Sequence, residues 1–144
     1  MFSKACEYAI KACIFVAKSS MRNERVTPKQ IADQINSPVA FTAKIMQELV
    51  KSDLVDSYRG AYGGFEIDKA KIDQISLSKI VKVIDGDKLY DGCGLGLDVC
   101  NENHPCPVHY QYKTIREDLK QLLDSTNLKQ LALGIENGLS YLKT

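Results

Sequence analysis

The sequence predicts a mainly α-helical protein with three short N-terminal helices, a small β-hairpin and longer C-terminal helices. First, apolar residues recur with a period near 3.6 in residues 2–20, 28–35 and 39–52, and a turn at 36–38 joins the last two segments. Second, the glycine-rich stretch 59–64 separates two short alternating segments, which is typical of a hairpin. A hairpin directly after the third of three helices predicts a winged helix-turn-helix, here followed by a long C-terminal helix.

Local signals support the starts of the first helices. Ser3 can cap the first helix, and Thr27-Pro28 places a capping hydroxyl and a proline at the start of the second. Cys6 and Cys13 lie seven residues apart on the apolar side of the first helix. We expect them to be small buried side chains rather than ligands.

The hairpin is expected to pair residues 54–58 with residues 65–67. Arg59 stands where this hairpin turns, and a guanidinium at such a tip can enter a narrow minor groove and contact phosphate. The alternative for Arg59 is an ordinary solvated turn charge. Three helices alone would be a weaker sign of DNA binding, because helix pairs are common.

The second half of the chain predicts three more helices, at residues 75–86, 109–125 and 127–142, the last weakened by Gly134 and Gly138. The long apolar stripe of the helix at 109–125 has little of its own chain to cover it, which favours a homodimer. The expected units are a DNA-binding domain at 1–86, a cysteine-rich cluster-binding loop at 87–109 and dimerisation helices at 110–144.

Three of the five cysteines fall in the stretch CGLGLDVCNENHPCPVH, with the spacing C-x6-C-x5-C followed by C-x2-H. Thiolate and imidazole are ligands for iron–sulfur clusters and soft metals. The spacing differs from that of zinc ribbons and of thioredoxin-type motifs. The stretch therefore favours a cluster held by Cys93, Cys100 and Cys106 with one further ligand, while bare redox thiols or another metal remain alternatives.

Composition indicates a soluble globular protein, with 144 residues, 44% hydrophobic and 26% charged. The net charge of +1 gives no overall nucleic-acid signal, although residues 1–60 carry +3 and residues 61–144 carry −2. The start of the chain lacks a secretory pattern, and its apolar runs are too short to span a bilayer. We expect a cytoplasmic protein, in which cysteines stay reduced.

The chain resembles the Rrf-two family of bacterial winged-helix repressors, which includes the cluster-biogenesis regulator IscR and the nitric-oxide sensor NsrR. The resemblance covers essentially the whole chain, and the wing motif together with the three cysteines is its specific part. The matching motifs are Glu7-Tyr8-Ala9, Ile31-Ala32, Pro38-Val39-Ala40-Phe41, Leu54-Val55, Ser57 to Phe65, Ile75-Ser76-Leu77, Asp85-Gly86 and Cys93, Cys100 and Cys106.

The resemblance implies a dimer whose two recognition helices enter successive major grooves of a palindromic operator. By position it implies cluster ligation by the three loop cysteines. His109 matches a histidine ligand that favours [2Fe–2S], whereas Glu7 matches an acidic ligand that some sensors donate from the partner subunit, compatible with [4Fe–4S] or [2Fe–2S]. We favour His109 and [2Fe–2S]. The residues implied to read DNA are Ser37, Pro38, Ala40, Phe41, Thr42 and Arg59.

Two departures from the family limit what carries over. Asp53 stands where the family usually has glycine, a position where aspartate tolerates a left-handed turn. Thr42 and Ala43 also differ from common residues of the recognition helix, so no operator sequence follows.

The function expected is a cytoplasmic transcriptional repressor that senses iron–sulfur status, redox state or nitric oxide. The main alternative is a clusterless regulator controlled by cysteine oxidation or by a protein partner. A small electron-transfer or cluster-carrier protein is a further alternative, whereas no catalytic set or nucleotide loop indicates an enzyme.

Overall fold

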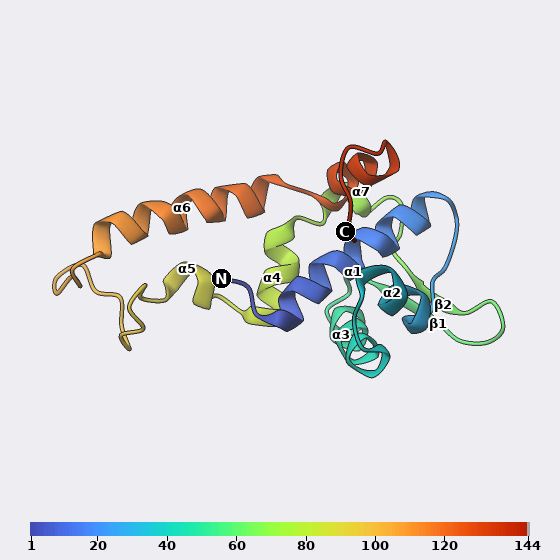
Figure 1. The fold of residues 1–144 in the computed structure, drawn as a ribbon, viewed down its shortest axis with the longest axis horizontal. Coiled ribbons are helices and arrows are strands. Elements are labelled where there is room, and N and C mark those ends of the chain that lie inside the picture. Colours follow the sequence, from blue (N-terminus) through green and yellow to red (C-terminus); the bar gives the residue numbers. More distant parts are fainter. Residues whose placement is uncertain (144) are drawn as a thin grey trace.

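A computed structural model describes residues 1–143 and shows a helical body from which one long helix projects (Figure 1). The predicted mainly α-helical, winged helix-turn-helix fold is confirmed. The elements are α1 (Lys4–Met21), α2 (Pro28–Ile35), α3 (Val39–Lys51), β1 (Asp56–Tyr58), β2 (Gly64–Glu66), η1 (Ile72–Gln74), α4 (Leu77–Asp85), α5 (Lys88–Asp91), α6 (His109–Ser125) and α7 (Leu128–Glu136).

Helix α1 forms the centre of the body because apolar residues lie on several of its faces. It packs against α2, α3, α4 and α7. Cys6 and Cys13 are 0% and 1% exposed in this core, as the sequence predicts. Burial raises the pKa of each thiol to about 12, so both remain neutral and unreactive at ordinary pH.

The helix starts follow their capping residues. The Ser3 side chain accepts a hydrogen bond from the Cys6 amide, and Thr27 and Gln30 form a reciprocal capping box ahead of Pro28. Ser76 precedes α4, and its hydroxyl bonds the Ser78 hydroxyl instead of a backbone amide of the helix.

The hairpin that follows α3 pairs three residues on each strand, and Ser57 lies opposite Phe65. The strands are shorter than the expected 54–58 and 65–67, because Leu54 and Val55 turn inward toward the core. Asp53 adopts φ +61°, so the left-handed turn survives without glycine, as expected.

The C-terminal part departs from the sequence-based expectations in two places. The short helix α5 was not predicted. The predicted continuation of the last helix to residue 142 is wrong: α7 ends at Glu136, and Gly138 follows with φ +70°.

The two C-terminal helices occupy different surroundings. Leu128 and Ala132 of α7 are fully buried in the core built around α1, although the sequence grouped α7 with α6. Helix α6 instead extends away from the body, and only α5 and the cysteine loop accompany its outer part (Figure 1). No helix within residues 1–143 is long and apolar enough to cross a membrane.

Candidate cysteine site and DNA-reading surface

The cysteine loop runs from the end of α5 to the start of α6. His109 is the first residue of α6 and is 3% exposed, while the three loop cysteines are partly buried. The loop is rich in glycine, asparagine and proline, so the chain can bend back toward the helix that follows. Gly94 lies against the Tyr112 ring, and a Cβ there would come within 2.7 Å of a ring carbon.

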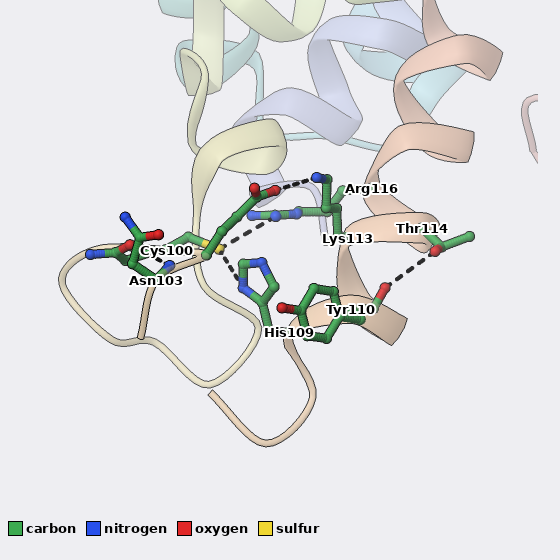
Figure 2. Close-up of polar contacts among 9 residues, drawn as sticks. Cys100, Asn103, His109, Tyr110, Lys113, Thr114 and Arg116 are labelled. Carbon is green, nitrogen blue, oxygen red and sulfur yellow. Dashed lines mark hydrogen bonds and ion pairs between the residues drawn. The ribbon is translucent and has the colours of Figure 1, made fainter. Parts of the chain in front are cut away.

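The predicted ligands come together as two pairs. The Sγ atoms of Cys93 and Cys106 lie 3.8 Å apart, and the Sγ of Cys100 lies 3.4 Å from Nδ1 of His109. Figure 2 shows the imidazole of His109 pointing at the Cys100 sulfur. Within residues 1–143 no three Cys, His, Asp or Glu side chains are arranged closely enough to form a ready metal shell. The two pairs therefore have to close on one another to form a single site.

Arg116 connects the start and the middle of the loop to α6. Its guanidinium donates to the carbonyl of Gly92, beside Cys93. The same group lies 3.4 Å from the Cys100 sulfur (Figure 2). One turn earlier on α6, Lys113 forms an ion pair with Glu102, which lowers the pKa of that carboxyl. The loop is thus fixed to α6 by two cationic side chains that the sequence reading missed.

The local electrostatics favour an ionised thiol at Cys93. The backbone amide of Leu95 lies 3.4 Å from the Cys93 sulfur, and this donor lowers the pKa of the thiol. A thiolate is the form that binds metals and attacks disulfides.

The donor chemistry of the loop fits an iron–sulfur cluster. Three thiols and one imidazole are the donor types that such clusters take. Nε2 of His109 is buried and has no hydrogen-bond partner in the described chain. The ring nitrogen that faces Cys100 is Nδ1, so Nε2 takes no part in the close pair with that thiol.

Glu7, the alternative fourth ligand, lies on the first turn of α1. It forms an ion pair with Lys4 at 2.9 Å, and this pairing lowers the pKa of the Glu7 carboxyl. Its partly exposed side chain is ionised at neutral pH and accessible to a second subunit.

The residues predicted to read DNA gather around the start of α3. Pro38, Ala40 and Phe41 are exposed. The Phe41 ring packs edge-on against Tyr8 of α1, with centroids 5.8 Å apart, and this contact covers part of the residue, which is 37% exposed. These residues precede or occupy the first turn of α3, where backbone amides point outward.

Thr42 occupies a different environment from its neighbours. It is 1% exposed, and its hydroxyl donates to the Pro38 carbonyl at 2.8 Å and pairs with the Ser37 hydroxyl. Ser37 is partly buried by the same pairing. Thr42 therefore stabilises the first turn of α3 and presents no side chain at the surface.

Arg59 lies at the tip of the hairpin and is exposed. Among residues 1–143, no side-chain hydrogen bond or ion pair involves its guanidinium. Two further exposed side chains on α3, Lys44 and Gln47, share the outer face with Ala40, which the 3.6-residue period could have indicated.

Similarity to known proteins gives the context of these sites. A family described as "Rrf2: Iron-dependent Transcriptional regulator" matches residues 2–133. The chain belongs to the Rrf2 family. Members of this family regulate transcription, and DNA binding is a property of the family. They are transcriptional regulators rather than enzymes, which confirms the expectation that the chain is not an enzyme.

Two relatives of the chain are transcriptional regulators that carry different names, CymR and IscR. The chain is 30% identical over 104 residues to the transcriptional regulator CymR of Bacillus subtilis, covering 72% of this chain and 70% of CymR. It is 25% identical over 124 residues to IscR of Erwinia tasmaniensis, covering 86% of this chain and 73% of IscR. These two relatives do not assign one signal to this chain.

Solved structures support the fold. The structure of CymR, "the Global Cysteine Regulator of B. subtilis", superposes with a TM-score of 0.76 at 27% identity, covering 92% of this chain and 95% of that one. IscR of T. potens superposes with a TM-score of 0.74 at 18% identity, covering 97% and 91%, which shows the shared fold.

Proposed function

We propose that this Rrf2-family chain is a cytoplasmic, homodimeric repressor whose affinity for a palindromic operator depends on an iron–sulfur cluster. The ligands would be Cys93, Cys100, Cys106 and His109, with Glu7 of the partner subunit as the alternative fourth donor. One observation carries the proposal: the loop returns three thiols and one imidazole to the start of α6 as two close pairs. His109 as the fourth donor favours [2Fe–2S] over [4Fe–4S].

A bound cluster would supply bonds that oxidants, nitric oxide or iron shortage can break. Residues of the chain would convert the loss of these bonds into a change in how the loop is attached to α5 and α6. Cys93 lies two residues after the end of α5 and His109 begins α6, so ligation of both would tie the end of one helix to the start of the next. From α6, Arg116 contacts the Gly92 carbonyl beside Cys93 and the sulfur of Cys100. Releasing the thiols would remove the link through the cluster and leave the contacts of Arg116 and Lys113 to hold the loop.

Helix α6 supplies the surface proposed for dimerisation. Its apolar residues alternate at spacings of four and three, which is the pattern of a helix seam that packs against a second helix. Ile115 and Leu122 are 59% and 54% exposed. The residues of this seam are Val108, Tyr112, Ile115, Leu119 and Leu122.

The reading heads of the proposed dimer are the start of α3 and the hairpin. Pro38, Ala40 and Phe41 would approach the major groove, and Arg59 would contact the minor groove or its phosphates. Ser37 and Thr42 would act indirectly, by holding the first turn of α3 in place.

Anaerobic purification followed by iron and sulfide analysis and a visible spectrum tests the cluster. Wild type and a Cys13→Ala control should both carry iron, sulfide and charge-transfer bands, because Cys13 is a core residue remote from the loop chemistry. Cys100→Ser should lose most of the bands. Iron-free wild-type protein after anaerobic reconstitution would refute the cluster.

The short distance between Cys93 and Cys106 supports a second candidate, a redox switch without a cluster. Their sulfurs lie 3.8 Å apart, and a disulfide needs roughly 2.05 Å, a small local movement. Oxidation by a peroxide would join the two sulfurs, release their two protons and reduce the peroxide to water. Peptide mapping after peroxide treatment of iron-free protein should then find Cys93 linked to Cys106 and Cys100 free.

A further inference from the structure

The hairpin contacts the linker between α1 and α2, and one side chain of this linker, Arg25, makes several of these contacts. The guanidinium carbon of Arg25 lies 3.6 Å from the centroid of the Tyr58 ring on β1. Its Nε donates to Glu66 on β2 at 3.1 Å, and its Nη1 donates to the carbonyl of Tyr62 at 3.3 Å. Arg25 therefore contacts both strands and the turn between them.

The backbone beside Arg25 adds a second connection. The Val26 amide donates to the Phe65 carbonyl at 3.1 Å, and the Phe65 amide donates to the Val26 carbonyl at 2.8 Å. A Cβ at Gly64 would come within 2.8 Å of the Val26 carbonyl oxygen, so the linker and the hairpin lie in close contact. Because the linker continues directly into α2, it connects the hairpin to the helix-turn-helix.

The hairpin needs such a support. It pairs only three residues per strand, and a two-stranded hairpin is marginally stable in water by itself. Arg59 stands next to Tyr58 and three residues before Tyr62, which are two of the three residues that Arg25 contacts. Arg59 thus lies between two residues whose positions are held by contacts with Arg25.

We propose that Arg25 is a positioning residue for DNA reading, which fixes the hairpin tip so that Arg59 meets the minor groove. The inference rests on the proposed role of Arg59. The planar guanidinium stacks flat on a ring while its fixed fork of donors reaches two acceptors, whereas a lysine ammonium is a compact charge on a flexible stem without that fork. Its groups are already engaged within the protein, and its side chain is only 35% exposed, so Arg25 acts through the hairpin rather than by touching DNA.

The test is a double-mutant cycle on a selected operator fragment, with Arg25→Lys, Arg59→Ala and the double variant. Arg22→Lys is the matched control, because Arg22 pairs with Glu136 on α7, away from the hairpin. Arg25→Lys should weaken operator binding about tenfold and lower the salt slope by about one phosphate contact, although the charge is kept. It should have no further effect when Arg59 is already alanine.

Three results would overturn the proposal in distinguishable ways. If Arg59→Ala leaves affinity and salt slope unchanged, the role of Arg59 fails and the positioning role fails with it. If Arg59→Ala weakens binding but the two effects add, Arg25 does not act through Arg59. Amide exchange in free protein gives the third: Gly63, whose amide bonds the Gly60 carbonyl at 3.0 Å, should exchange at least about fivefold faster in Arg25→Lys. Unchanged exchange would show that Arg25 does not hold the tip.

Discussion

Replacing Thr42 by valine separates a structural role at the start of α3 from direct DNA contact. Valine keeps the branched shape but removes a hydroxyl that bonds the Pro38 carbonyl and the Ser37 hydroxyl. A buried neutral hydrogen bond contributes about 1 kcal/mol, so two lost bonds should cost about 1–2 kcal/mol of unfolding free energy. The Pro38 carbonyl keeps the Thr42 amide as a donor at 2.9 Å, which favours the lower end of that range.

Urea unfolding measures this cost, and operator binding at 25 °C measures the effect on function. A loss of about 1–2 kcal/mol leaves a protein of ordinary stability almost wholly folded, so affinity should change less than about threefold. The matched control is Thr114→Val on α6, whose exposed hydroxyl bonds the Tyr110 carbonyl at 3.2 Å and should cost less than about 0.5 kcal/mol. Unchanged stability with a large loss of operator affinity would refute the structural role and make Thr42 a direct contact.

Three further predictions concern the hairpin, the core thiols and the helix seam. In urea unfolding, Gly64→Ala should lower the free energy of unfolding by about 1–3 kcal/mol, because Gly64 has φ +133° and a Cβ there would meet the Val26 carbonyl. Gly60→Ala is the control and should lower the free energy of unfolding by less, because Gly60, at φ +94°, has open space around it. A larger loss for Gly60→Ala than for Gly64→Ala would contradict the hairpin geometry. The Cys13 thiol has a folded pKa of about 12, above its unfolded value, so its contribution to stability is complete below about pH 9 and falls as pH rises from there toward 12. Urea midpoints should therefore fall more steeply with alkaline pH in wild type than in Cys13→Ala, and parallel curves would contradict the buried thiol. Ile115→Asp in the α6 seam should shift sedimentation toward the monomer, whereas Thr114→Asp on the same helix, outside the seam, should not; an unchanged dimer in Ile115→Asp would refute that seam.

Much of the fold could be predicted because local signals agree with the tertiary structure. Ser3, Thr27 and Pro28 set helix starts by short-range hydrogen bonding and fixed φ, which depend on neighbouring residues alone. The hairpin followed from its glycines and alternation. The end of α7 was missed because apolar residues continue to Leu142 although the helix stops before Gly138.

The sequence predicted the residues of the site from their types, but it did not predict the side chains that support them. The cysteine spacing indicated the loop, whereas Arg116 reaches Gly92 and Cys100 from 24 and 16 residues away, which no local pattern reveals. Arg25 likewise reads as an ordinary polar linker residue until the hairpin folds against it. The burial of Thr42 was hidden because a threonine near a helix start is equally compatible with capping, packing and DNA contact.

The central claim is that the state of the cysteine loop controls the reading of DNA by α3 and the hairpin. The most direct measurement is operator affinity of anaerobically reconstituted protein and of the same protein after iron removal, in wild type and in Cys100→Ser. A coupling of about 1–3 kcal/mol predicts a difference of about 5- to 150-fold between the two states of wild type, and no difference for Cys100→Ser. Equal affinities for the two wild-type states, with the cluster shown to be present in one of them, would contradict the account.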